Sequence, residues 1–221
     1  TWDANAPIQR ADTLMNRPLK DVKQVTQYLD GLGRPLQAVA KQISFPTGGN
    51  AKDLVTTFMY DAFGREQKNY LPFSDSGFNG NFKTNPFQQQ ATFIGQQFSG
   101  ETWYYSKNNY EPSPASRISK TMPAGNSWVG SDRGVSLEYW NNDAGDTYLK
   151  NWYIALSGDS MPRVLGGYEA GQLQKKKTVD EQLNVVIEYL DKSGKTVLKS
   201  AGKNTDWLMT AYIYDIYGNL R

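Results

Sequence analysis

The sequence predicts an all-β fold made of antiparallel β-hairpins, which form one or two extended curved sheets with a loop-rich insertion. Aromatic residues make up 13% of the 221 residues, and the 14 tyrosines favour strands. The chain also holds 20 glycines and 10 prolines, which suit tight turns between short strands. Four segments share the pattern Asp-x-x-Gly, and each follows a β-rich stretch, which is typical of hairpins.

The first two of these turns predict a hairpin pair within residues 1–73. Strands at 25–29 and 54–60 lead into turns at 30–33 and 61–64. In such a turn the Asp side chain accepts hydrogen bonds from backbone N–H groups ahead of it, and the glycine adopts a positive φ before the return strand. We expect the arginine after each glycine to pair with the Asp or to stack on a tyrosine.

Residues 74–127 predict a loop-rich insertion. The stretch 79–97 is rich in Asn, Gln, Gly and Phe, and we expect a long loop there with one helical turn around 87–93. The Pro-containing stretch 110–117, with Ser113 and Ser116, predicts a rigid loop.

Residues 128–221 predict further hairpins. We expect a fifth hairpin from strands at 135–140 and 147–156, joined by a turn at 141–145. A short strand within 168–180, carrying Leu173, and a turn at 180–184 should follow.

The last two Asp-x-x-Gly turns lie at 191–194 and 215–218. Strands at 185–190 and 196–199 flank the first of them, and a strand at 207–214 precedes the second. The final residues then read as the start of a returning strand. We therefore expect residues 1–221 to form a single region that is a fragment of a longer chain.

Two kinds of turn alternate along the sequence. Tyr28 and Tyr189 stand two residues before the Asp of their turns, whereas Tyr60 and Tyr214 stand directly before it. Because strand side chains alternate between faces, the two kinds present their aromatic residues on opposite faces. The order predicts a two-hairpin unit that is used twice. The residues of the four turns are Tyr28, Asp30, Gly33, Arg34, Tyr60, Asp61, Gly64, Arg65, Tyr189, Asp191, Gly194, Lys195, Tyr214, Asp215 and Gly218.

The composition excludes several chemistries. Without cysteine or histidine, the chain has no thiolate or imidazole for zinc, no CxxC redox pair and no imidazole base. The net charge of +2 does not indicate a nucleic-acid-binding surface. The sequence contains no run of 18 to 20 apolar residues, so membrane insertion is not predicted. The turn carboxylates should serve as caps rather than catalysts, and no alternating carboxylate loop predicts a calcium site. We expect no enzyme activity, no cofactor and no metal.

Exposed aromatic residues leave one alternative open. Trp103, Tyr104, Trp140 and Trp152 can stack on sugar rings in a carbohydrate-binding module, or they can pack across neighbouring strands. Packing is the more usual role of aromatic residues in thin sheets.

The four turns resemble those of the RHS/YD-repeat family, whose hairpin carries the signature Tyr-Asp-x-x-Gly-Arg. Residues 60–65 match the signature completely, and residues 214–219 depart from it only in having Asn for the final Arg. The turns at Asp30 and Asp191 carry a Leu between Tyr and Asp. Further stretches are similar to the region that precedes the repeats in large bacterial RHS proteins, namely 28–35, 60–72, 110–117, 167–173 and 180–181.

The resemblance implies a non-catalytic structural segment of a secreted or cell-surface protein. In that family the repeats wind into a β-shell, which often encloses a C-terminal toxin, or they present an adhesive surface. The expected partners are the following RHS repeats of the same polypeptide, an enclosed toxin or a surface glycan. Family members that release a toxin cut themselves at an Asp-Pro site, and this chain contains no Asp-Pro. We therefore expect no self-cleavage.

Overall fold

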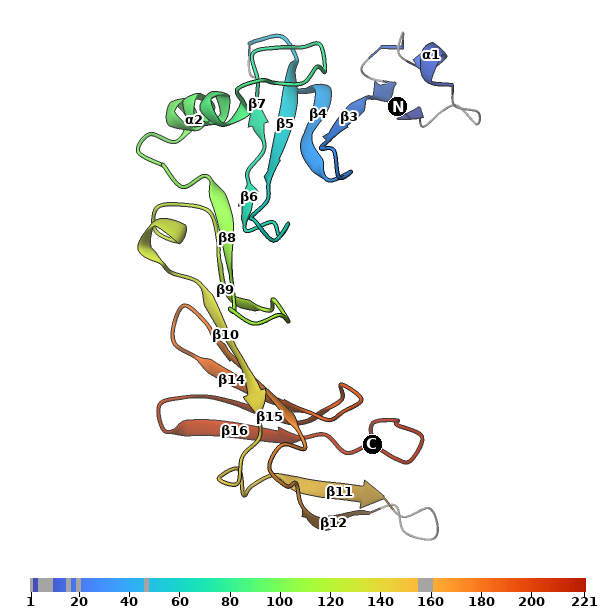
Figure 1. Ribbon diagram of the computed structural model, residues 1–221, viewed down its shortest axis with the longest axis vertical. Helices are drawn as coiled ribbons and strands as arrows, with labels where there is room; N and C mark the ends of the chain where they lie inside the picture. Colours follow the sequence, from blue (N-terminus) through green and yellow to red (C-terminus); the bar gives the residue numbers. More distant parts are fainter. Residues whose placement is uncertain (1, 4–9, 15–16, 19–20, 46–47, 155–160) are drawn as a thin grey trace. The chain divides into compact units, whose positions relative to one another are not determined.

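The computed structural model describes residues 2–3, 10–14, 17–18, 21–45, 48–154 and 161–221. These residues form mostly antiparallel β-sheet, so the prediction of an all-β fold is confirmed (Figure 1). The chain divides into two compact units, where sequence alone indicated one region. Unit 1 comprises residues 1–109 and 121–133, and unit 2 comprises residues 110–120 and 134–221. Within the described residues, no helix is long and apolar enough to cross a membrane.

Unit 1 is built around three neighbouring strands and one 12-residue helix. Its elements are β1 (Trp2–Asp3), α1 (Ala11–Leu14), β2 (Val22–Lys23), β3 (Val25–Leu29), β4 (Pro35–Ser44), β5 (Lys52–Met59), β6 (Lys68–Tyr70), β7 (Phe73–Ser74), α2 (Pro86–Gln97) and the short 3₁₀ helix η1 (Val129–Ser131). The strands β8 (Tyr105–Tyr110) and β9 (Ile118–Met122) form a hairpin whose residues 110–120 belong to unit 2, and the chain passes into unit 2 again after residue 133.

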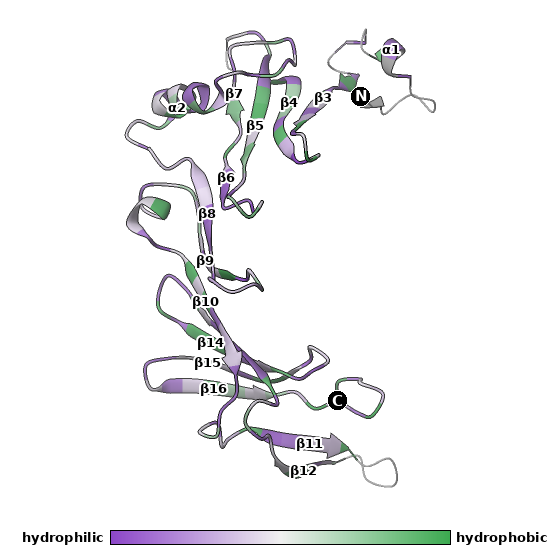
Figure 2. Ribbon diagram, viewed as in Figure 1, coloured by the Kyte–Doolittle hydropathy of each residue, from purple (hydrophilic) through white to green (hydrophobic). Residues whose placement is uncertain are grey.

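The strands β3, β4 and β5 pair in sequence order, and β6 and β7 both pair with the outer edge of β5. Hydrophobic stretches on β4 and β5 are visible in Figure 2. Val39, Val55 and Phe73 form the buried core, with Tyr28 and the α2 residue Phe93 packed against it. The segment after the second hairpin therefore supplies one of the three core side chains of the unit.

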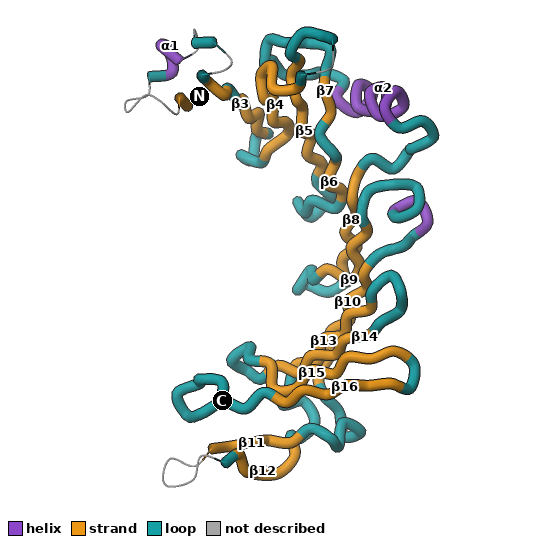
Figure 3. The backbone as a smooth tube through the Cα atoms, turned by 180° about the vertical axis from the view of Figure 1, so that it is seen from behind, coloured by secondary structure: helices purple, strands orange, loops and turns teal. Residues whose placement is uncertain are grey.

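Unit 2 contains five neighbouring sheet strands in the order β16, β15, β14, β13, β10, and a separate two-stranded sheet. Its strands are β10 (Val135–Asn141), β11 (Lys150–Ile154), β12 (Pro162–Gly167), β13 (Gln174–Val179), β14 (Val185–Leu190), β15 (Thr196–Lys203) and β16 (Asp206–Ala211). Leu149, Leu173 and Tyr189 form its buried core. The tight turn between β15 and β16 can be followed in Figure 3.

The repeat of two hairpins that the sequence predicts occurs once in unit 1, as β3–β4–β5, and once in unit 2, as β14–β15–β16. The two copies share their register. In the first hairpin of each copy, Tyr28 lies opposite Gln37 and Tyr189 lies opposite Leu198. In the next strand pair, Val39 lies opposite Val55 and Ser200 lies opposite Met209. Counted from the turns, these are equivalent positions.

The prediction of a fifth hairpin from residues 135–140 and 147–156 is wrong. The strand β10 pairs with β13, and β11 pairs with β12. The intervening residues do not fold back as a simple turn, because Leu149 enters the core and Asp146 binds Lys175. The expected second strand also extended over residues 155–156, which lie outside the described residues.

The stretch 79–97 contains more helix than the sequence indicated. In place of a loop with one helical turn, α2 runs for 12 residues, with a proline in its first turn. Gln and Ala are good helix formers, and proline is well tolerated at a helix start. Burial of Gln90 and Ile94 fixes the helix on the unit.

Candidate functional site

The four Asp-x-x-Gly turns share one hydrogen-bond geometry. In each, the backbone N–H of the Asp donates to the carbonyl four residues ahead, and the glycine N–H donates back to the Asp carbonyl. One Asp carboxylate oxygen also accepts the N–H groups two and four residues ahead. The four glycines Gly33, Gly64, Gly194 and Gly218 have φ between 77° and 82°. This is a type I turn followed by a left-handed residue, as the sequence indicates.

A fifth turn of this geometry lies between β13 and β14. Asp180 accepts the N–H groups of Gln182 and Asn184, and its own N–H donates to the Asn184 carbonyl. The glycine position is held by Leu183, which has φ 67° and an exposed side chain. The missing glycine explains why the Asp-x-x-Gly pattern does not include this turn.

Hydrogen bonds lower the pKa of three turn carboxylates, those of Asp30, Asp61 and Asp215. The N–H of Arg34 lowers the pKa of Asp30, and the N–H of Arg65 likewise lowers the pKa of Asp61. Hydrogen bonds from Asn219 lower the pKa of Asp215 to about 2. A general acid needs a raised pKa, which is the opposite shift.

Glu66 is a carboxylate with a raised pKa, and the cause is burial. It lines none of the three cavities described below.

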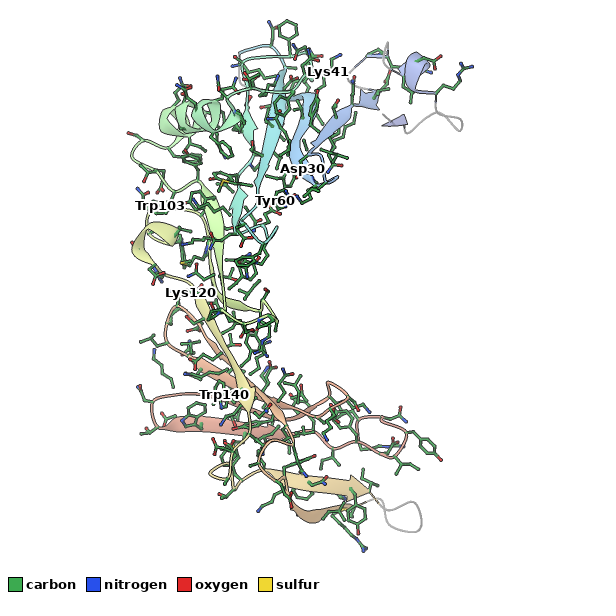
Figure 4. All side chains as sticks on the ribbon, viewed as in Figure 1. Asp30, Lys41, Tyr60, Trp103, Lys120 and Trp140 are labelled. Atoms are coloured by element: carbon green, nitrogen blue, oxygen red, sulfur yellow. The ribbon has the colours of Figure 1, made fainter. Side chains whose placement is uncertain are left out.

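In each unit, the cation after the glycine of the first turn contacts the tyrosine of the second turn. Arg34 donates through Nε and Nη2 to Asp30, at 2.8 and 2.7 Å, and its guanidinium lies 4.6 Å from the centre of the Tyr60 ring. Asp30 and Tyr60 are labelled in Figure 4. In unit 2, Lys195 Nζ lies 5.1 Å from the Tyr214 ring. The expected pairing and stacking of Arg34 is thus present, but the tyrosine belongs to the following hairpin.

The glycine of the second turn gives this cation its space. A Cβ at Gly64 would lie 3.2 Å from Arg34 Nη1, and a Cβ at Gly218 would clash with Lys195 Nζ. Arg65, the cation of the second turn in unit 1, pairs with Asp61 and lies over Phe63.

The rigid loop expected at 110–117 closes the β8–β9 hairpin. Glu111 accepts hydrogen bonds from Arg117 and from the Ser113 hydroxyl, and the bonds from Arg117 lower the pKa of Glu111 to about 2. Ser116 has φ 49°. The guanidinium of Arg117 lies 4.4 Å from the Tyr139 ring, which is another cation–tyrosine contact.

A buried ion cluster fastens the loop of residues 75–83 to the sheet of unit 1. Lys83 Nζ lies 2.9 Å from Asp53 and 3.0 Å from Asp75. Burial alone raises the pKa of Asp53, but the bonds from Lys83 and from the N–H groups of Gly80 and Gln42 outweigh it and lower the pKa. Every charge in this cluster has a partner.

A second buried cluster lies in unit 2. Lys175 Nζ binds both carboxylate oxygens of Asp146, at 2.8 and 3.1 Å, and Asp146 also accepts the hydroxyls of Tyr148 and Tyr189. The two tyrosine hydroxyls bind each other, and burial strongly raises the pKa of Tyr189. The ammonium group lies over the rings of Trp140 and Tyr189. Neither Lys83 nor Lys175 lies in a recognisable motif, so the sequence gives no signal for these two buried lysines.

The four aromatic residues considered for sugar stacking fall two in each unit. In unit 1, Trp103 and Tyr104 line a cavity of about 290 Å³, together with Leu71, Phe98, Glu101 and Trp128. In unit 2, Trp140 lies under Lys175, whereas Trp152 lines a groove of about 200 Å³. Another cavity of unit 1, of about 460 Å³, lies beside α2 and is lined by polar side chains such as Ser74, Gln89 and Gln96.

In the part of the chain that the structure describes, no three His, Cys, Asp or Glu side chains gather as metal ligands would. The carboxylates of the two buried clusters are paired with lysines. The chemistry present is therefore that of hydrogen-bonded turns, buried ion pairs and aromatic cavities.

Comparison with known proteins gives one match. The family described as "Domain of unknown function (DUF6443)" matches residues 1–141, which cover unit 1 and continue to the end of β10. No curated protein matches the chain.

Proposed function

Because the chain belongs to the family described as a domain of unknown function, DUF6443, we propose a function from its own geometry: a non-catalytic scaffold segment of a secreted or cell-surface repeat protein. In this proposal the segment begins a β-shell of the RHS type, which further hairpins of the same polypeptide continue. The shell then encloses a C-terminal toxin or presents an adhesive surface.

The observation that carries the proposal is the repeated two-hairpin unit. Two separate stretches of the chain adopt the same strand register, the same turn geometry and the same cation–tyrosine contact. A unit that repeats in register is suited to addition of further copies along a sheet. A catalytic site would be expected to break the repeat at one copy.

The polar groups also favour a structural role. The turn carboxylates are occupied by backbone N–H groups, and both buried lysines are paired with aspartates. Such groups fix the chain, because their hydrogen bonds and charges are already used within the protein.

The experiment is to append two hairpins with Tyr-Asp-x-x-Gly-Arg turns after Arg221 and to compare melting temperatures. We expect the extended chain to melt at a higher temperature. The control carries the same extension with Asp→Ala and Gly→Val in both added turns, which should remove the gain. Equal melting of the original and extended chains would contradict the scaffold.

A second candidate function is carbohydrate binding by unit 1. The cavity beside Trp103 and Tyr104 combines aromatic walls with the carboxylate of Glu101, which suits a sugar ring and its hydroxyl groups. A glycan array followed by tryptophan fluorescence titration tests it. Binding should disappear in Trp103→Ala and persist in Trp152→Ala, and silence across the array would retire this candidate.

A further inference from the structure

The outer edge of β16 differs from the equivalent edge in unit 1. The strand β5 carries β6 and β7 on its outer edge, so its residues are covered on that side. The strand β16 ends its sheet, and no described strand pairs with its outer edge. Every residue of β16 is exposed, including Trp207, Leu208 and Met209.

Equivalent residues show what a strand on this edge would change. Val55 and Met209 occupy the same register position, opposite Val39 and Ser200. Val55 is fully buried, because Phe73 lies opposite it on β7 and packs into the core. Met209 is 50% exposed.

The composition of β16 lacks the features that keep a solvent-exposed edge strand from pairing with a further strand. Natural edge strands commonly carry charged residues, prolines or bulges that prevent further pairing. The sequence of β16 is Asp-Trp-Leu-Met-Thr-Ala, whose only charge is at its first residue. Its pairing with β15 is regular throughout.

A groove lies on the face of the sheet that carries Met209. It has a volume of about 200 Å³, and its walls include Tyr148, Trp152, Tyr168, Leu198, Met209 and Ala211. An apolar cavity of about 150 Å³ is enough to hold a benzene ring. The groove therefore has room for one aromatic side chain, at the level where Phe73 lies in unit 1.

We propose that β16 accepts an antiparallel strand from a further hairpin of the same repeat, and that this strand inserts an aromatic side chain into the groove beside Met209. The inference rests on the proposed scaffold function and names the partner of this edge. Backbone hydrogen bonds to β16 supply affinity, and the aromatic residue in the groove fixes the register. The added strand covers Met209 as β7 covers Val55.

The chain itself provides the test segment. Residues Lys68–Ser74, appended directly after Arg221, place their phenylalanine as far from Asp215 as Phe73 lies from Asp61. The matched control carries alanine in place of that phenylalanine. Hydrogen exchange of the β16 amides, read by mass spectrometry, measures pairing.

We expect exchange of the β16 amides to slow at least about 10-fold in the phenylalanine extension and far less in the alanine extension. In the extended chain, Met209→Arg should restore fast exchange, whereas Thr210→Arg, on the opposite face of β16, should not. Equal protection by both extensions, or protection by neither, overturns the proposal.

Size-exclusion chromatography of the original chain tests the competing occupant. A dimer whose β16 amides are protected, and which the appended strand does not dissociate, assigns the edge to a second copy and also overturns the proposal. If the two added hairpins raise the melting temperature while both short extensions behave alike, the scaffold stands and only the groove assignment fails.

Discussion

Unit 1 and unit 2 contain the same three-stranded repeat in the same register, but different segments bury its strands in each. In unit 1, Phe73 and Phe93, from segments outside the repeat, pack on the core, and the loop of residues 75–83 is fastened by Lys83. In unit 2, Tyr148 and Asp146 close over Tyr189, and β16 keeps an exposed edge. The turns therefore determine the register of the strands, whereas the segments outside the repeat determine which strand faces are buried.

Removal of the buried lysines should give the largest effect and should separate the two units. Lys83→Met leaves Asp53 and Asp75 buried without their cation, and we expect a loss of about 3–5 kcal/mol in the unfolding free energy of unit 1. Lys175→Met should cost less, because Asp146 keeps the hydroxyls of Tyr148 and Tyr189. Denaturant unfolding followed by hydrogen exchange in each unit measures both. Equal losses would show that the hydroxyls contribute nothing.

Truncation at the equivalent strand position should show how far the units differ in burial. Val55→Ala removes two buried methyl groups, and we expect a loss of roughly 2 kcal/mol. Met209→Ala should change the unfolding free energy by less than about 0.5 kcal/mol, since Met209 is half exposed. Chemical denaturation of both variants measures the difference. A large loss in Met209→Ala would indicate that β16 is already covered.

Exchange of residues between neighbouring turns should test the shared turn geometry. Leu183→Gly relieves a left-handed residue that has a Cβ, and we expect a gain of about 0.5–1 kcal/mol after the entropy of glycine is counted. Gly194→Leu, at the same position of the next turn, should cost about 1 kcal/mol or more. Thermal melts measure both changes. A loss in Leu183→Gly would mean that the exposed leucine side chain makes a stabilising contact.

Exchange of the two turn cations should give a small effect. Arg34→Lys removes the two-pronged contact with Asp30, and we expect a slightly lower melting temperature. Lys195→Arg should raise it slightly, because a guanidinium at this position can bind Asp191 and still lie over Tyr214. Both shifts should shrink at high salt. Shifts that do not depend on salt would assign the effect to packing of the side-chain stem.

Acid should weaken both copies of the repeat over the same pH range. The folded pKa of Asp215 is about 2, below the value of 3.8 for a free Asp side chain, and the pKa of Asp61 is also lowered. Each carboxylate therefore stabilises the fold above about pH 4, and this contribution disappears as pH falls toward 2. Melting temperatures between pH 7 and 2 measure the loss, and Asp215→Asn should flatten part of it. Acid sensitivity in only one unit would show that the turns are not equivalent.

Much of the fold follows from local sequence. A turn involves five consecutive residues, and an Asp with a glycine three positions later favours its conformation wherever it occurs. The turns at Asp30, Asp61, Asp191 and Asp215 and the strands beside them could be located for this reason. The length of the helix α2 was underestimated because half of its residues are polar. Its packing is visible only in the structure, where Phe93 contacts the core that contains Phe73.

The long-range features could not be read from the same patterns. Strands at 135–140 and 147–156 have the alternation of a hairpin, yet the first pairs with β13, because burial of Leu149 and the bond from Lys175 to Asp146 hold the intervening loop elsewhere. A buried lysine looks like any surface lysine in the sequence, since its burial depends on which loop covers it.

The class of fold, the turn positions and the repeat of the two hairpins follow from local sequence, because they depend on contacts between residues close along the chain. The tertiary structure decided which strands pair across long loops, which charges are buried and where the groove beside Met209 lies. These features depend on the closure of distant segments around a shared core, where many weak contacts compete and no short motif records the result.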